Sequence, residues 1–301
     1  MNVLSLFDGI SCGQVALKRC GVEIENYFAS EINKQAIKVT QDNHPKTKQI
    51  GDVTKVNAND LPKIDLLMGG SPCQGFSFSG KQLNFEDPRS KLFFEFVRLI
   101  KECNPKYWML ENVVMKQEYQ DVISAHLGCE PRKLNSSNTS AQNRVRLYWA
   151  NFKIEDPKNQ GIDLDSILED VEMVGPGAIR GRRLNKATIL GRRLDERGKR
   201  QDYDKSVPIT QCLEVRASNR NKSNCLTTVA KDTVLTTMPI GRHPDAYKNK
   251  LPHRNYTAVE RCRLMNLPDQ YCREISLNQT VKATGNGWDV GMISHIFSSI
   301  A

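Results

Sequence analysis

Short apolar runs separated by polar turns recur through the first half of the chain. They are too short for helices and carry apolar side chains at successive positions, which is typical of strands buried on both faces of a parallel sheet. A later run, Arg144–Phe152, instead alternates polar and apolar residues, as in a strand with two different faces. Strands are expected at residues 3–7, 27–30, 48–50, 64–68, 107–110 and 144–152.

Stretches with helical periodicity lie between and after these runs. The helix over Gln14–Cys20 is expected to end at Gly21, because glycine adopts the left-handed conformation that closes a helix. Thr257 and Glu260 have the spacing of a capping box, which predicts a helix start at Thr257. Helices are expected at 14–20, 33–43, after Asp87-Pro88, at 164–172, 257–265 and 290–300.

This order of elements predicts the fold class and a division of the chain. Alternating strands and helices favour an α/β fold with a doubly wound, mostly parallel, Rossmann-like sheet. The pattern changes after about residue 152, and Gly175-Pro176-Gly177 marks a boundary. We expect a large domain over 1–152 completed by 274–301, a linker at 153–177, and a second, smaller domain rich in strands and loops at 178–273.

Composition excludes several classes of protein. The 301 residues are 39% hydrophobic and 26% charged, with a mean hydropathy of −0.51, as in a globular protein with a buried core. No apolar run approaches the roughly 20 residues of a membrane span, and the N-terminus lacks the pattern of a signal peptide. Nine scattered cysteines without Cys-x-x-Cys pairs predict a reducing, cytoplasmic location and no structural metal.

Positive charge is concentrated in one segment. The net charge is +9, but residues 176–263 hold 20 basic and 8 acidic side chains, a net of +12, and the rest of the chain is net −3. A solvated surface and a surface that follows the phosphates of a nucleic acid both agree with such a segment, and charge alone does not separate them.

Polar residues follow the predicted strands where ligands bind in open parallel sheets, beyond the strands' carboxyl ends. A glycine-containing turn at 7–13 follows the first strand, Glu31 follows the second and Asp52 the third. Together they suit a cofactor that carries a nucleoside. The turn lacks the complete Gly-x-Gly-x-x-Gly pattern, so a dinucleotide is disfavoured, and a purely structural turn stays open.

The next strand ends bear the candidate chemistry. Cys73 follows a proline on a glycine-flanked loop, where it is either a nucleophile or an inert buried thiol. Glu111 is either a general acid or an ordinary helix-capping residue. Arg144 and Arg146 are either an anion clamp or exposed charges at a sheet edge.

The order of these motifs resembles that of the DNA (cytosine-5) methyltransferases. Later segments fit as well, and the Phe-Asp-Gly-Ile turn is most similar to the de novo branch, whereas the short length resembles phage and bacterial enzymes. Two positions differ from the family pattern, Tyr256 for the usual Leu and Asn266 for the usual Gly. The shared motifs are Phe-x-Gly at 7–9, Pro-Cys-Gln at 72–74, Glu-Asn-Val at 111–113, Gln-x-Arg-x-Arg at 142–146, Arg-x-x-Thr-x-x-Glu-x-x-Arg-Leu at 254–264 and Gly-Asn-Gly-Trp at 285–288.

The resemblance implies S-adenosyl-L-methionine as cofactor, with S-adenosyl-L-homocysteine as product. Phe7 would stack on the adenine, Glu31 would hold the ribose hydroxyls and Asp52 the adenine amino group. The C-terminal helix would fold back onto the first domain to close this pocket. The implied cofactor-binding residues are Phe7, Asp8, Gly9, Ile10, Ser11, Cys12, Glu31, Ile32, Asp52, Val53, Pro72, Asn286, Gly287 and Trp288.

The resemblance also implies the reaction and its partner, double-stranded DNA. Cys73 would add to carbon 6 of an extruded cytosine while Glu111 holds a proton against ring nitrogen 3. Arg146, supported by Arg144, would fix the cytosine carbonyl or an adjacent phosphate. The implied DNA-binding residues are Ser77, Gln142, Arg182, Arg183, Arg192, Arg193, Arg216, Arg220 and Arg254.

Other functions are less consistent with these residues. Family members that act on transfer RNA usually carry Cys-Phe-Thr shortly after Glu-Asn-Val, and this chain has Val-Met-Lys-Gln at 114–117. A catalytically silent DNA-binding regulator is disfavoured by Cys73 and Glu111, and a nicotinamide dehydrogenase by the incomplete glycine pattern. The residues leave open which DNA sequence is recognised and what the oligomeric state is. They also leave open whether the enzyme works in restriction-modification with a cognate endonuclease, in phage DNA modification or alone.

Overall fold

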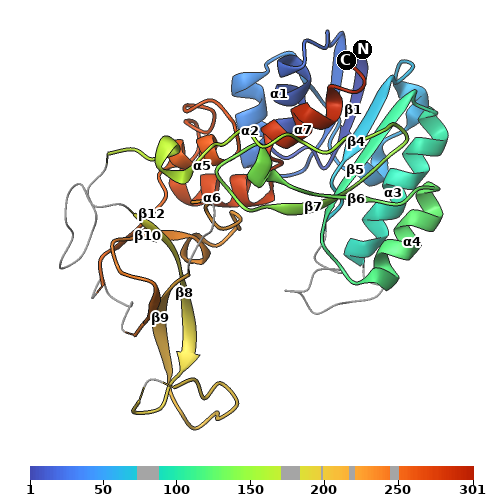
Figure 1. Ribbon diagram of the computed structural model, residues 1–301. Coiled ribbons are helices and arrows are strands. Elements are labelled where there is room, and N and C mark those ends of the chain that lie inside the picture. Colours follow the sequence, from blue (N-terminus) through green and yellow to red (C-terminus); the bar gives the residue numbers. More distant parts are fainter. Residues whose placement is uncertain (73–87, 171–183, 198, 217–220, 245–250) are drawn as a thin grey trace.

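The fold is built on a seven-stranded sheet in the order β3-β2-β1-β4-β5-β7-β6 (Figure 1). The computed structural model describes residues 1–72, 88–170, 184–197, 199–216, 221–244 and 251–301. The first five strands are parallel, and β7 runs antiparallel to both β5 and β6. The strands are β1 (Asn2–Leu6), β2 (Asn26–Ser30), β3 (Lys48–Gln49), β4 (Leu66–Gly69), β5 (Tyr107–Val113), β6 (Arg132–Asn135) and β7 (Val145–Ala150).

Helices cover both faces of this sheet, because its central strands are apolar on both sides. In β1, Val3 packs into one core while Leu4 and Leu6 pack into the other. The first core is completed by α1, α2 and α7, and the second by α3 and α4. The helices are α1 (Cys12–Arg19), α2 (Lys34–Asn43), α3 (Pro88–Cys103), α4 (Gln117–Leu127), α5 (Ala258–Leu264), α6 (Leu277–Asn286) and α7 (Val290–Phe297).

Most elements expected in the first half are confirmed, and the fold class with them. Gly21 ends α1 with φ of +76°, and the capping box of Thr257 and Glu260 begins α5. The expected helix at 164–172 is wrong in extent, because only a 3₁₀ turn at Leu164–Ile167 forms. The pattern of apolar and polar positions did not predict β6, α4 or α6.

The C-terminal helix folds back onto the first strands, as expected. Helix α7 packs on α1, and Val290, Ile293 and Phe297 enter the same core as Val3 (Figure 1). Asn266, which stands where the family usually has Gly, has φ of +56°, a conformation that Asn tolerates better than most residues. Its Nδ2 donates to the carbonyl of Thr139 at 3.1 Å, which ties the end of α5 to the large sheet.

A second, antiparallel sheet lies beside the large one, in the order β11-β9-β8-β10-β12. Its longest pair, β8 and β9, projects away from the body of the molecule (Figure 1). The described part of 153–177 is packed rather than a free spacer, since Ile154, Leu164 and Ile167 are buried in the first core. The strands are β8 (Asn185–Arg193), β9 (Ile209–Val215), β10 (Val234–Thr236), β11 (Gly241–His243) and β12 (His253–Asn255).

The described residues contain neither a candidate membrane span nor a candidate metal site. None of the helices described is both long and apolar enough to cross a membrane. Within the same residues, no group of three or more His, Cys, Asp or Glu side chains is arranged to hold a metal ion.

Candidate active site

A cavity of about 560 Å³ opens beyond the carboxyl ends of β1, β2, β4 and β5. The strand order reverses between β1 and β4, and such a reversal leaves a crevice where the following loops diverge. Of the predicted cofactor-binding residues, Phe7, Gly9, Ile10, Glu31, Ile32, Asp52, Val53, Pro72 and Asn286 line this cavity, whereas its lining does not include Asp8, Ser11, Cys12, Gly287 and Trp288.

The turn after β1 is strained in a way that fixes its shape. Phe7, Gly9 and Ser11 all have φ between +56° and +59°, a conformation that is uncommon for non-glycine residues and recurs at functional sites. Asp8 lies beneath the turn, where it accepts hydrogen bonds from the hydroxyls of Ser11 and Tyr27. Burial raises the pKa of Asp8 to about 6, although these hydrogen bonds oppose the shift.

Glu31 joins the end of β2 to this turn. Its Oε2 accepts from the backbone N–H of Gly9 at 2.8 Å, and its Oε1 accepts from Ile32 and Asn33, also at 2.8 Å. Three backbone donors therefore hold the carboxylate in one orientation at the cavity wall. Asp52 is held at the end of β3 by the backbone and hydroxyl of Thr54, and these hydrogen bonds lower its pKa.

Glu111, Arg146 and Trp288 meet on the opposite side of the cavity from three distant parts of the chain. Arg146 Nε lies 3.0 Å from Glu111 Oε1, and Trp288 Nε1 donates to Glu111 Oε2 at 3.0 Å. The side chains of Arg146 and Glu111 are only 14% and 11% exposed, so water screens the pair weakly. Burial opposes the charge of Arg146, but Glu111, Cys225 and Tyr148 together outweigh it, and the pKa of Arg146 is raised.

Gly70 makes this arrangement sterically possible. A Cβ atom at position 70 would lie 2.9 Å from Trp288 Nε1 and 3.0 Å from Glu111 Oε2, closer than real Cβ contacts. A side chain there would push the indole off the carboxylate. Asn112 holds the following segment, because its Nδ2 donates to Ser71 Oγ at 3.2 Å. Pro72 lines the cavity, and Cys73 and Ser77 come after it, outside the described residues.

Arg144 is at the cavity but is directed away from Glu111. Its Nη1 donates to the carbonyl of Leu226, and its Nη2 donates to those of Gly285 and Gly287. The residue is 2% exposed. Through these hydrogen bonds its guanidinium links the start of β7 to the segment between β9 and β10 and to the end of α6. It orders the site around Arg146 and does not reach the Glu111 carboxylate.

Two predicted DNA contacts are wrong, because both side chains are interior. Gln142 is fully buried, with Nε2 donating to the carbonyl of Leu264 at 2.6 Å. Arg254 is 6% exposed, and its two Nη atoms each lie 2.7 Å from an oxygen of Glu260. In the sequence, Gln142 and Arg254 resemble contact residues because each begins a family motif. In the structure, their side chains connect the two sheets and α5 in the interior.

Three other predicted DNA contacts, Arg192, Arg193 and Arg216, lie on or next to strands of the small sheet. Arg192 and Arg216 belong to one face of it, and Arg193, the next residue of β8, belongs to the opposite face. Arg182, Arg183 and Arg220 lie outside the described residues.

Helix α6 supplies cavity residues that the sequence analysis missed. Gln279 and Lys282 both line the cavity from this helix. A local signal was present, because Ser276 and Gln279 have capping-box spacing and both of its hydrogen bonds form. The Gly-Asn-Gly-Trp motif at 285–288 predicted the end of this helix, Asn286, at the cavity, but no motif includes Gln279 or Lys282.

Comparison with known proteins agrees with this arrangement. The chain is 37% identical over 194 residues to the orphan methyltransferase M.SPRI of Bacillus phage SPR, which covers 58% of this chain and 43% of that protein. It is 30% identical over 321 residues to the type II methyltransferase M1.ScrFI of Lactococcus lactis subsp. cremoris, covering 98% and 76%.

Solved structures share the fold. Entamoeba histolytica methyltransferase EhMeth superposes with a TM-score of 0.69 at 15% identity, over 100% of this chain and 99% of that one. The family model of C-5 cytosine-specific DNA methylases matches residues 1–301. The chain therefore belongs to the C-5 cytosine-specific DNA methylase family.

Proposed function

We propose that the protein transfers a methyl group from S-adenosyl-L-methionine to carbon 5 of an extruded cytosine in duplex DNA. The observation that carries this proposal is the joining of Glu111, Arg146 and Trp288 at the cavity wall next to Pro72, which Cys73 follows. Family membership supports it. The phage relative is matched over less than half of its own length, so the activity is inferred from the site as well as from likeness.

The cavity walls suit the proposed methyl donor. Glu31 and Asp52 offer fixed carboxylates to hydroxyl and amino donors, and Phe7, Ile32 and Val53 offer apolar surface to a flat ring. Ile32 is 74% exposed, which is unusual for an isoleucine and is consistent with a surface that a bound ring covers. When bound, this cofactor supplies an electrophilic methyl group, and the chain's own residues orient and activate the acceptor.

Cytosine carbon 5 is a weak nucleophile, so the protein must activate the ring. We propose that the Cys73 thiolate adds to carbon 6 while Glu111 holds a proton at ring nitrogen 3. Arg146 gives Nε to Glu111, and its Nη2 makes a weak contact with Cys225 Sγ at 3.8 Å. In this proposal, the guanidinium of Arg146 donates to the cytosine carbonyl or to an adjacent phosphate. Carbon 5, made nucleophilic by the addition at carbon 6, would take the methyl group from the bound cofactor, and loss of the proton from carbon 5 would then break the bond between Cys73 Sγ and carbon 6 and release the thiolate.

The same proposal assigns a role to each segment of the chain. Residues 1–152 and 274–301 would form the catalytic domain, 178–273 the target-recognition domain, and 153–177 their connection. Extruding a base takes a few kcal/mol, which contacts to the basic segment would offset. Such an enzyme would act in the cytoplasm of a bacterial or phage-infected cell.

Methyl transfer from labelled S-adenosyl-L-methionine tests the proposal directly. Duplex DNA should be labelled, transfer RNA should not, and Cys73→Ala should abolish labelling. A duplex with 5-fluorocytosine should trap a covalent adduct, because no proton can leave carbon 5. Bisulfite sequencing of DNA from cells that express the chain would then give the recognised sequence. Labelling of transfer RNA alone, or full turnover by Cys73→Ala, would contradict the proposal.

A further inference from the structure

The two faces of the small sheet have different chemistry. Leu213 and Val215 of β9 pack with Ala187 of β8 in a small core on one face. Alternation along the strands places Thr188 and Arg192 of β8, together with Glu214 of β9, on the other face. That polar face is where the cationic side chains of this sheet gather.

Glu214 lies at the centre of the polar face and receives three guanidiniums. Arg192 Nε donates to its Oε1 at 3.0 Å, Arg242 Nε to the same oxygen at 3.1 Å, and Arg216 Nη2 to its Oε2 at 3.2 Å. They come from three neighbouring strands or strand ends. The Glu214 side chain is only 8% exposed, and those of Arg192, Arg242 and Arg216 are 16%, 36% and 75% exposed. The carboxylate therefore lies beneath guanidiniums that reach progressively into solvent.

The charges of this group do not balance. Burial alone would raise the pKa of Glu214, but the hydrogen bonds from Arg192, Arg216 and Arg242 outweigh it and lower the pKa to about 2. Three guanidiniums around one carboxylate leave two positive charges. Asp202 lies 3.7 Å from Arg192, but it also pairs with Arg200 and so does not reduce this excess. Arg192 and Arg242 bind Glu214 through Nε, and Arg192 Nη1 also lies 3.7 Å from Asp202.

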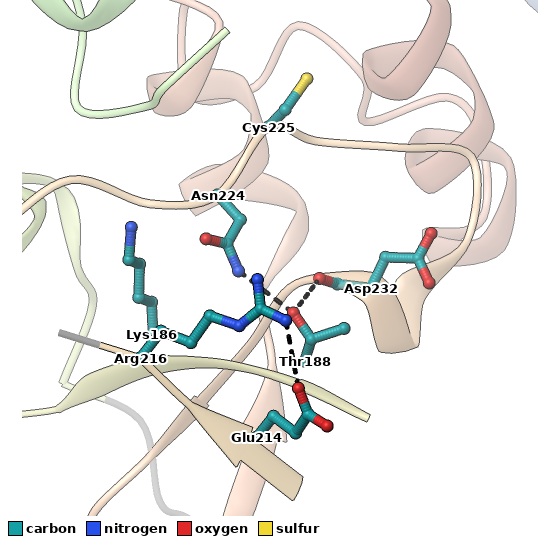
Figure 2. Close-up of a pocket in the computed structure, with 7 residues that line it drawn as sticks. All are labelled: Lys186, Thr188, Glu214, Arg216, Asn224, Cys225 and Asp232. Atoms are coloured by element: carbon teal, nitrogen blue, oxygen red, sulfur yellow. Dashed lines mark hydrogen bonds and ion pairs between the residues drawn. The ribbon is translucent and has the colours of Figure 1, made fainter. Parts of the chain in front are cut away.

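The cluster lies next to the candidate active site. A cavity of about 240 Å³ runs between the polar face and the segment of Asn224 and Cys225. Figure 2 shows Arg216 lying across this cavity onto Glu214, with the Lys186 ammonium pointing toward the same segment. Cys225 Sγ in turn lies 3.4 Å from Arg144 Nη1 and contacts Arg146. The polar face and the Glu111 site thus share a wall.

We propose that Glu214 is a positioning residue for DNA binding. It holds Arg192, Arg216 and Arg242 as a preformed platform for backbone phosphates of the duplex whose cytosine enters the active site. Guanidiniums already ordered by a carboxylate lose less rotamer entropy when phosphates bind. The inference rests on the proposed DNA substrate. It adds a role for an acidic residue, which would by charge alone repel DNA, and it assigns Arg242 to the interface.

The test exploits two changes that raise the net charge equally. Glu214→Gln removes the central carboxylate, and Glu196→Gln removes an exposed carboxylate on the same hairpin. Binding of a short fluorescein-labelled duplex is followed by anisotropy. Glu214→Gln should raise the Kd about tenfold, since hydrogen bonds that order a charged group are worth that much. Glu196→Gln should bind as tightly as the wild type or more tightly. Tighter or unchanged binding by Glu214→Gln would overturn the proposal.

A second variant keeps the proposal testable if Glu214→Gln does not fold. Arg242→Gln alters a partly exposed member of the cluster. It should lower the slope of log K against log salt by about 0.9, the loss of one phosphate contact, for all sequences alike. An unchanged slope would refute the phosphate platform. Methylation of DNA by the wild type separates failure of the proposed function from failure of the Glu214 proposal. If the wild type does not methylate DNA, the proposed function fails. If it does, and both variants bind DNA as the wild type does, only the proposed role of Glu214 fails.

Discussion

Replacing Arg254 by methionine should destabilise the protein without removing a DNA contact. Both Nη atoms of Arg254 lie 2.7 Å from Glu260, whose side chain is fully buried, so Arg254→Met leaves an uncompensated carboxylate in the interior. Breaking such a pair typically costs 3–5 kcal/mol. Glu260 keeps backbone donors from Thr257 and Glu169, both at 2.9 Å, so we expect about 3 kcal/mol, at the lower end of that range.

That loss corresponds to a Tm lower by roughly 6–12 °C for a chain of this size, measured by circular dichroism. The double variant Arg254→Met/Glu260→Gln should recover part of it, because no buried charge is then left unpaired. Duplex binding, measured well below the Tm, should match that of the wild type. A variant with unchanged Tm and weakened DNA binding would show that Arg254 contacts DNA after all.

Three further predictions follow from the site. Trp288→Phe keeps an aromatic ring but removes the hydrogen bond to Glu111, so kcat for duplex methylation should fall about tenfold, and an unchanged kcat would show that the bond does not orient Glu111. Glu31→Ala removes the carboxylate that fixes the turn after β1, and the calorimetric Kd for S-adenosyl-L-homocysteine should rise at least about tenfold, with DNA binding as the unaffected control. Asp8 has a pKa raised from 3.8 to about 6, so its protonated form stabilises the fold fully below pH 4 and this contribution, roughly 3 kcal/mol, is lost as the pH rises through 6. Asp8→Asn should therefore gain Tm relative to the wild type between pH 4.5 and 7.5, and a constant difference would contradict the burial of the charge.

The sequence by itself determined the elements and the chemistry of the large sheet. Apolar runs that must be buried on both faces specify central parallel strands, and each such strand ends in the residues that later line the cavity. Local rules were sufficient where the cause is local, as at Gly21, which ends α1, and at the capping box of Thr257 and Glu260. The family motifs predicted the reactive residues, because the order of motifs along the chain is a property of the sequence and does not depend on the tertiary structure.

Only the tertiary structure decided which polar residues face a ligand and which hold the fold together. Gln142 and Arg254 resemble DNA contacts in the sequence, but in the interior Gln142 donates to Leu264, 122 positions away, and Arg254 turns back onto Glu260, 6 positions away. Trp288 meets Glu111 across 177 positions of chain because α7 returns to the first strands. Hydrophobic burial sets these long-range neighbours, and a buried polar group must then find its partner there, which no local pattern encodes.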